Sequence, residues 1–587
     1  MKAIRIHAGI LALFLTIFFW GLNAQYPLLG HDYFYFWPRI LEGKWHFLRQ
    51  GFAPLRFAPH LCGGFFQYGN PQDVFYSLPQ LLSFFLPLWT ATQLSIAVAM
   101  IVGYIGWVRF GRDVLELSRS WALTLAIVCT ANGFFFVHIA VGHLSYFTLP
   151  LMSWMLWALF HRTRETGWLL LERAIIFAAV TGTFLYSGTH IAWFIVIPLI
   201  GIFLPMDLLL SNAFRDRVMM LLRRIVVFLP CAIALGASKL VAIWSLMHVL
   251  PRTVDFQTYT AGQNSLLFAI KSLWIAPQLP QFFTLDPINR IHEESMFTSP
   301  VALFGSILLV VFILKHRKLQ KWKKIAVLAF AAFVTFLILA IVHGKGIVPQ
   351  TLQTLPLFSS LRVPERFLVI LSLLTSIAGV LGCALWFQKN KGNMKNERAA
   401  LIASAITVFA FATAYIPLIP HLEYTVPYDQ IVAGLKTNPD PMKEPVQEVQ
   451  DLVGVKVSDF QYFFAHATGS RCYETIQSLN APPLRDGPVN LAWSGALNVY
   501  NPACIAYGKE NGCKPGDRIA VDDLENLQSF INGKPTTWKL SQVQIFADRL
   551  TVTTLIVLVL MVLACGCKRF WMYTSKKLNA LKEKPRV

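Results

Sequence analysis

The chain has 587 residues, of which 55% are hydrophobic and only 14% are charged, and its mean hydropathy is +0.52. Soluble domains carry roughly 25% charged residues, so this composition excludes an ordinary soluble protein. The net charge of +20 would suit a nucleic-acid-binding protein, but the positions of the basic residues argue against that partner.

The apolar residues gather in runs of about 18 to 25 residues, the length that crosses a bilayer core about 30 Å thick. The first run has no small-residue cleavage site before His31 and many more runs follow, so we interpret it as a retained helix rather than a signal peptide. The sequence therefore predicts an α-helical polytopic membrane protein with about twelve transmembrane helices. They cover residues 8–29, 88–108, 119–139, 145–161, 168–188, 190–208, 224–246, 297–314, 325–343, 365–387, 399–420 and 549–567.

The basic residues indicate the orientation of these helices. Alternate short loops, together with the two termini, hold more than half of the 51 Lys and Arg residues. Lys and Arg in short loops near span ends mark the cytoplasmic side, so both termini are expected in the cytoplasm. The positive charge is then an orientation signal and an attraction to anionic lipid, and no nucleic-acid partner is expected.

The opposite side should carry the longer polar segments. The first outer loop (30–87) begins with an aromatic run after Asp32, which we expect at the bilayer interface because Trp and Tyr are enriched there. Residues 421–548 have the composition of a soluble protein and are predicted to form a small extracytoplasmic α/β domain before the last helix. Within it, "CIAYGKENGC" favours a Cys504–Cys513 disulfide in an oxidising compartment. Residues 549–587 would form the last helix and a basic cytoplasmic tail.

The polar residues that are hardest to explain lie at the outer ends of the predicted helices. Taken singly, a His in a turn is usually a helix cap or interface residue, and an Arg at a span end usually contacts lipid headgroups. Lys239 differs, because a charge at membrane depth is costly and usually faces a cavity or a partner. The set comprises His31, Asp32, His143, His190, Arg252, His292, Glu293, Glu294, Arg362 and Arg366, with Lys239 inside the seventh predicted helix.

Taken together, these residues bring acidic and imidazole groups from at least four separate segments to one membrane face, beside Arg and Lys. Such a mixture suits acid–base or metal-assisted chemistry on a substrate that carries phosphate. The neighbouring helices would let that substrate keep a lipid tail in the bilayer.

The sequence also resembles a known superfamily. A long first outer loop that opens with an acidic residue, in a protein of eleven to thirteen spans, resembles the GT-C superfamily of polyprenyl-phosphate-sugar-dependent membrane glycosyltransferases. More narrowly, four stretches are similar to the YfhO-type bacterial membrane proteins, and the resemblance covers residues 8–420. They are "CGGFFQYGNPQDVFYSLPQLL" (62–82), "VGHLSYFTLPLMSW" (141–154), "YSGTHIAWF" (186–194) and "PLFSSLRVPERFLVILSLLTSIAGVLG" (356–382).

This resemblance implies a GT-C-like module over residues 1–420 and an inverting transfer of a sugar from a polyprenyl-phosphate carrier. The acceptor would be a cell-envelope glycan, lipid or protein outside a bacterial inner (plasma) membrane. Asp32 falls where such enzymes carry their catalytic acidic residue. It would act as the general base, with His31 or Glu293 assisting. Because His31 replaces the second acid of the usual pair, metal dependence stays open, with Asp32, His31 and Glu293 as ligands if a divalent metal binds.

The remaining candidates would bind the substrates. Arg362, Arg366, Arg252 and Lys239 are expected to hold the donor phosphate. His143, His190, His292, Asn70 and Gln72 are expected to contact the sugar or the acceptor.

Three alternatives stay open. A flippase or transporter of lipid-linked saccharides would place polar residues along a path through the membrane, whereas only Lys239 lies mid-span. A polymerase or ligase of such saccharides would carry its catalytic Arg and His in one long outer loop. A scaffold that presents residues 421–548 would leave the His, Asp and Arg residues unexplained.

Overall fold

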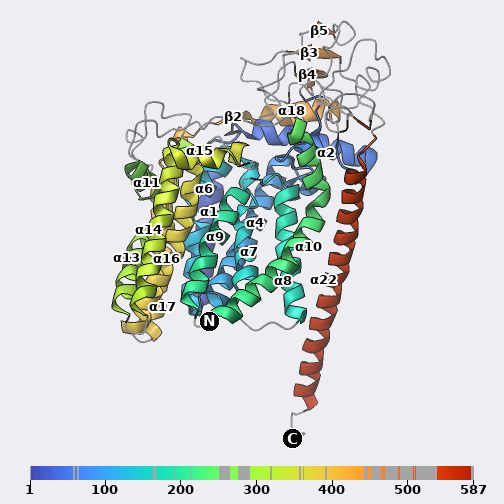
Figure 1. Ribbon diagram of the computed structural model, residues 1–587. Coiled ribbons are helices and arrows are strands. Elements are labelled where there is room, and N and C mark those ends of the chain that lie inside the picture. The colour runs from blue at the N-terminus through green and yellow to red at the C-terminus, as the bar shows by residue number, and fades with distance from the viewer. Residues whose placement is uncertain are drawn as a thin grey trace.

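The computed structural model is a bundle of helices (Figure 1). Ten of its described helices are long and apolar enough to cross a membrane, so the chain is a polytopic α-helical membrane protein. The structure describes residues 2–56, 58, 60–61, 65–162, 167–190, 192–211, 213–249, 265–274, 291–316, 320–355, 358–360, 363–390, 393–422, 424–441, 447–450, 460, 464–469, 487–488, 507, 509–510 and 539–582.

Every predicted transmembrane segment overlaps a described helix. The first segment, 8–29, was predicted too long, because its helix ends at Leu22 and a strand begins at Leu28. Ten segments match α1 (Lys2–Leu22), α4 (Leu88–Asp113), α5 (Arg119–Thr130) with α6 (Gly133–Ala140), α8 (Gly167–Tyr186), α9 (Ala192–Leu210), α10 (Phe214–Val249), α14 (Lys321–His343), α16 (Leu368–Asn390), α17 (Asn393–Tyr415) and α22 (Gln542–Lys582). The other two are the shorter helices α7 (Met152–Phe160) and α13 (Pro300–Lys315). The α7 segment is short because it begins with the 3-10 turns η2 (Leu144–Tyr146) and η3 (Leu149–Leu151), the second of which contains Pro150.

Close packing of small residues holds part of the bundle together. A Cβ on Gly305 of α13 would lie 1.9 Å from the Gly379 carbonyl oxygen of α16, and a Cβ on Gly382 would lie 2.0 Å from the Gly305 oxygen. Only glycine permits such a backbone approach, which is how membrane helices associate without a hydrophobic driving force between them. The sequence "SIAGVLG" therefore places α13 directly against α16.

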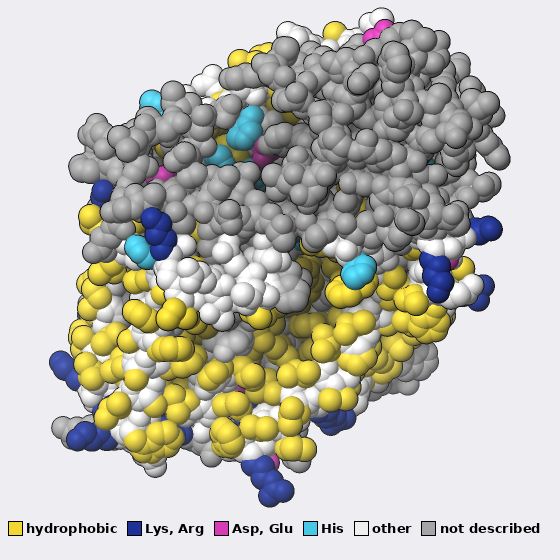
Figure 2. Space-filling view, turned by 45° about the horizontal axis from the view of Figure 1, so that its top comes forward, with side chains coloured by type: hydrophobic (Ala, Val, Ile, Leu, Met, Phe, Trp, Pro, Cys, Tyr) yellow, Lys and Arg dark blue, Asp and Glu magenta, His cyan; other side chains and the backbone are white. Residues whose placement is uncertain are grey.

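The two ends of the bundle differ. Figure 1 shows both chain termini at one end, and at the other end α2 (Tyr33–Gln50), α15 (Ile347–Gln353) and α18 (Tyr428–Thr437). We call the latter the α2 end. Figure 2 shows hydrophobic side chains over a broad area of the face in view, with Lys and Arg side chains at the edges of this area. Because both termini lie at the same end of the bundle, the structure agrees with an even number of spans. Which end faces the cytoplasm stays a prediction.

Most of the aromatic run after Asp32 packs inside the protein, whereas the sequence predicted contact with the lipid interface. Tyr33, Phe36 and Trp37 on α2 are buried in the protein, and the Trp37 indole donates a hydrogen bond to Thr92 of α4 at 3.1 Å. These rings pack against other helices because α2 runs along the end of the bundle. The run is therefore part of the protein core.

The described residues of the segment before α22 form several short strands and the helix α18. Strand β1 (Leu28–Gly30), directly before the candidate site, pairs antiparallel with β2 (Tyr424–Pro427). A second sheet has the order β4-β3-β5, with β3 (Glu448–Gln450) parallel to β4 (Ala467–Gly469) and antiparallel to β5 (Gly487–Pro488). The prediction of a separate domain over 421–548 stays a prediction, and Cys504 and Cys513 lie outside the described residues.

Candidate active site

Two Gly-His turns pack against each other at the α2 end. The Asp32 N–H donates to the Val141 carbonyl oxygen at 2.8 Å. Gly142 has a φ of +100°, and a Cβ there would lie 2.4 Å from the Tyr33 nitrogen, while a Cβ on Gly30 would lie 2.2 Å from the Ala140 oxygen. Glycine is required at both positions for this approach, which brings His31 and Asp32 beside His143.

The Asp32 carboxylate lies among imidazoles. Its Oδ1 is 3.3 Å from His31 Nε2, and its Oδ2 contacts His143 Nε2. The His292 ring lies 5.2 Å from the His143 ring and 5.7 Å from the His31 ring, between centroids. We call these four residues the histidine cluster. Its Asp32 side chain is 15% exposed and its His31 side chain 23%, so a substrate can reach it.

The cluster holds Asp32 in its charged form. Burial by itself would raise the pKa of the Asp32 carboxyl, but the imidazoles of His143 and His31, together with the hydrogen bond from His143, outweigh it, and the pKa lies well below its ordinary value. Burial lowers the pKa of His292 well below its ordinary value. At neutral pH the site therefore contains a carboxylate beside a neutral imidazole.

A second carboxylate lies next to the cluster, on the short helix α12 (Ile291–Glu294). Glu293 accepts hydrogen bonds from Arg366, from Nε at 2.8 Å and from one terminal nitrogen. Burial would raise the pKa of Glu293, but the Arg366 guanidinium and His138 hold it well below its usual range. Glu293 is thus an ionised partner of Arg366, which makes it a weaker candidate for a base or metal ligand than the sequence indicated.

Two residues that the sequence reasoning missed complete this region. His138 is fully buried on α6; its Nδ1 donates to the Phe134 oxygen at 2.8 Å, and its Nε2 lies 3.5 Å from Glu293. The Tyr146 ring lies 4.7 Å from the His138 ring, and its buried hydroxyl has no hydrogen-bond partner among the described residues. A His inside the apolar stretch "GFFFVHIA" was a usable signal, since polar side chains are rare at membrane depth.

Lys239 belongs to a different group of residues. Its side chain is fully buried on α10 and donates to Asp73 Oδ2 at 3.0 Å and to the Tyr68 carbonyl oxygen at 2.8 Å. The Tyr68 hydroxyl bonds Ser238 at 2.7 Å, and Ser238 donates to Asp548 of α22 at 2.6 Å. We call these five residues the Lys239 network. The Lys239 side chain is only 1% exposed and is paired with Asp73, whereas the Arg366 side chain is 18% exposed. The enclosure of Lys239 does not favour its predicted role in binding phosphate.

Three predicted substrate-binding residues form contacts within the first loop and the turn after α8. Asn70 donates to the Tyr35 hydroxyl at 3.1 Å and accepts from the Gln72 N–H at 2.9 Å. His190 Nδ1 lies 3.2 Å from the Gly188 oxygen, and a Cβ on Gly188 would lie 2.5 Å from the Gln72 oxygen. These contacts are all within the protein, and the predicted role of the three residues in binding the sugar or the acceptor stays a prediction. Arg252 and Arg362 lie outside the described residues.

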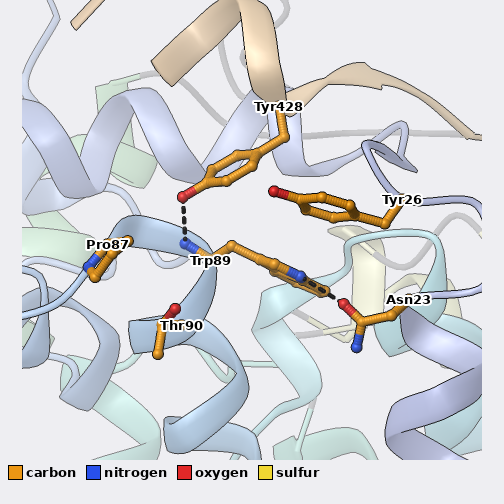
Figure 3. Close-up of a pocket in the computed structure, with 6 residues that line it drawn as sticks. All are labelled: Asn23, Tyr26, Pro87, Trp89, Thr90 and Tyr428. Atoms are coloured by element: carbon orange, nitrogen blue, oxygen red, sulfur yellow. Dashed lines mark hydrogen bonds between the residues drawn. The ribbon is translucent and has the colours of Figure 1, made fainter. Parts of the chain in front are cut away.

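A cavity of about 640 Å³ opens beside the same end of the bundle (Figure 3). The Trp89 indole donates to Asn23 at 2.9 Å, and the Trp89 N–H donates to the Tyr428 hydroxyl at 3.3 Å. The Trp89 ring also packs on Tyr33, which follows Asp32, at 5.3 Å. The lining residues are Asn23, Tyr26, Pro87, Trp89, Thr90 and Tyr428, so the cavity adjoins the candidate site without containing its residues.

Comparisons with known proteins leave the family of this chain undetermined. No family model and no curated protein matches the sequence. One similar solved structure is the cryo-EM structure of the arabinofuranosyltransferase AftD from Mycobacteria, mutant R1389S, at 14% identity and a TM-score of 0.42. The match covers 78% of this chain and 32% of the AftD chain, so this chain spans about a third of the length of AftD. The narrower YfhO-type resemblance gains no support from these comparisons.

Proposed function

We propose that the protein is an integral-membrane glycosyltransferase of the GT-C type, which moves a sugar from a polyprenyl-phosphate carrier to a cell-envelope acceptor. The observation that carries this proposal is the convergence of the ionised Asp32, several imidazoles and the Glu293–Arg366 pair at one end of a transmembrane bundle. A lipid-linked donor can reach such a site while its tail stays in the bilayer.

In the proposed reaction, Asp32 is the general base. The acceptor hydroxyl oxygen forms a bond to the anomeric carbon, and its proton moves to Asp32. The bond from that carbon to the carrier phosphate breaks, and its electron pair leaves with the polyprenyl phosphate. The configuration inverts because the acceptor attacks the face opposite the leaving phosphate. One well-placed base contributes about 10²- to 10⁴-fold to such a rate. His31 and His143 orient the carboxylate through their Nε2 atoms.

Arg366 is the proposed donor-phosphate ligand. The leaving phosphate gains negative charge as the glycosidic bond breaks, and a guanidinium placed there stabilises that charge. Glu293 holds the Arg366 side chain by two hydrogen bonds, so we assign Glu293 a positioning role. Arg252 and Arg362 stay predicted phosphate ligands, because they are cations at the outer ends of predicted helices.

Orientation is tested first, because the reaction requires the α2 end to face outside the inner membrane. A reporter that is active only outside the cytoplasm, fused after residue 450, should be active, and one fused at the C-terminus should be silent. Activity of a cytoplasm-only reporter at residue 450 would reverse the proposed topology.

Activity is tested with the full-length protein in liposomes, supplied with a panel of radiolabelled polyprenyl-phosphate sugars and a cell-envelope extract as acceptor. We expect at least one donor to lose its sugar with stoichiometric release of polyprenyl phosphate. If no donor supports transfer but the liposomes move lipid-linked saccharide between leaflets, the protein is a flippase and the enzymatic proposal is wrong.

A further inference from the structure

The histidine cluster contains a set of atoms that can bind a metal. One ligand atom from each of His31, Asp32 and His143 lies within 4.8 Å of the others. Ligand atoms around a tetrahedral zinc ion at about 2.0 to 2.2 Å from the metal are about 3.3 Å apart, which small side-chain rotations can reach from this arrangement. The His31–Asp32 separation of 3.3 Å already has that value.

The type of ligand limits the type of metal. Two imidazoles and one carboxylate suit a first-row transition metal such as Zn²⁺, whereas Mg²⁺ and Ca²⁺ prefer oxygen ligands. Catalytic zinc sites typically have three protein ligands and leave a fourth position for water or substrate. His292 adds a neighbouring imidazole beside His31 and His143.

The backbone holds these ligands in place before any metal binds. Asp32 and His143 lie on two turns that are joined by the Asp32-to-Val141 hydrogen bond and packed together at Gly30 and Gly142. Ligands on such docked turns need little reorganisation to bind an ion. The nearby cation Arg366 is paired with Glu293, which limits its repulsion of a metal.

We propose that His31, Asp32 and His143 bind a divalent transition-metal ion, with Zn²⁺ as the best match. This ligand set differs from the one expected from the sequence, because Glu293 pairs with Arg366 and His143 takes its place. The binding rests on geometry alone, while its role rests on the proposed function: the metal would acidify an acceptor hydroxyl that ligates it. A monodentate Asp32 would keep its second oxygen to accept the proton.

The test uses the full-length protein with a non-histidine tag, stripped with EDTA and dialysed against metal-free buffer. We expect it to bind about one Zn²⁺ per chain, measured by mass spectrometry of the metal content, and not to bind Mg²⁺. His31→Ala and His143→Ala should each weaken Zn²⁺ binding at least tenfold. His421→Ala is the matched control, because His421 is an exposed histidine at the same end of the bundle, and it should bind as the wild type does.

Two further measurements keep the proposal testable if a variant fails to fold. Co²⁺ added to the wild type should give visible absorption bands of a nitrogen and oxygen site, and Zn²⁺ should abolish them and raise the unfolding temperature. A stripped wild type that binds no Zn²⁺ overturns the metal proposal, as does binding that both histidine variants retain.

The two proposals can fail separately. A metal-free wild type that still transfers sugar would leave the proposed function intact and remove the metal. Stoichiometric Zn²⁺ binding without transfer from any donor would leave the metal site and remove the glycosyltransferase.

Discussion

The histidine cluster and the Lys239 network are both polar groups with buried or partly buried carboxylates, but they distribute charge differently. In the Lys239 network each charge has a fixed opposite partner: Lys239 pairs with Asp73 at 3.0 Å, and Asp548 pairs with Arg56 at 2.8 Å. In the histidine cluster, one carboxylate faces imidazoles whose charge depends on the protons or metal that they bind. The first arrangement serves stability, and the second suits chemistry.

The position of each group in the fold agrees with this difference. The Lys239 network joins α10 to α22 through Ser238 and Asp548. Only 6% of the apolar segment of α22 is buried in the protein, against 94% for α5 with α6. Polar contacts therefore anchor α22, which has few buried apolar side chains. The histidine cluster joins the two Gly-His turns to the short helix α12 and keeps part of its surface exposed.

The sharpest test of this comparison is Asp32→Asn. The change keeps the size of the side chain but removes the base, so sugar transfer per folded molecule should fall by about 10²- to 10⁴-fold. Asp429→Asn is the control, since Asp429 is exposed on α18 at the same end, and it should keep wild-type transfer. Retention of more than about a tenth of the activity by Asp32→Asn would place the base elsewhere.

The opposite result is expected for Asp73→Asn. It leaves the Lys239 charge buried without its carboxylate, which should lower the free energy of unfolding by about 3 to 5 kcal/mol. Transfer per folded molecule should stay near the wild-type value, measured after removal of aggregates. Lys239→Met together with Asp73→Leu should recover much of the stability, because a well-packed apolar pair can replace a buried ion pair. Loss of transfer in a stable double variant would give Lys239 the phosphate role after all.

The Glu293–Arg366 pair should behave as part of the site. Arg366→Ala should lower kcat/KM by about 10²- to 10³-fold, the effect of removing one group that stabilises developing charge. Arg366→Lys should recover only part of this loss, because a point charge does not replace a planar fork. Glu293→Gln should lower kcat/KM by less, and the loss should come from a higher KM for the donor rather than from a lower kcat. Wild-type turnover by folded Arg366→Ala would remove Arg366 from the mechanism.

The smallest expected effect is a dependence of stability on pH in the first loop. His60 is buried and its Nδ1 donates to the Ala467 carbonyl oxygen at 3.2 Å, and burial lowers its pKa from 6.5 to about 4. Because the folded pKa is depressed, this stability is present above pH 6.5 and is lost as the pH falls toward 4.

Between pH 7.5 and 5.5 the wild type should therefore lose about 1 kcal/mol more stability than His60→Asn. His60→Asn keeps a donor for the Ala467 oxygen but does not titrate. Unfolding midpoints at the two pH values give the comparison, and equal losses in both proteins would show that His60 is not the titrating group.

The apolar lengths in the sequence were sufficient to predict the helices. Each predicted segment overlaps at least one helix, because the need to pair every backbone group within the bilayer leaves little alternative for an apolar run of that length. The same reasoning explains why 145–161 was placed correctly but predicted too long: Pro150 interrupts the helix in a way that hydropathy does not register. Asp32 and His143 also stood out from the sequence as polar residues at span ends.

Only the tertiary structure decided which partner each of these residues has. Asp32 and His143 are more than 100 residues apart and meet because glycines 30 and 142 let two turns touch. Glu293 and Lys239 each acquired a partner, Arg366 and Asp73, from a distant segment, and His138 joined the site from inside a helix. A sequence specifies the cost of placing each polar group near a membrane, but the packing of the helices determines which other group offsets that cost.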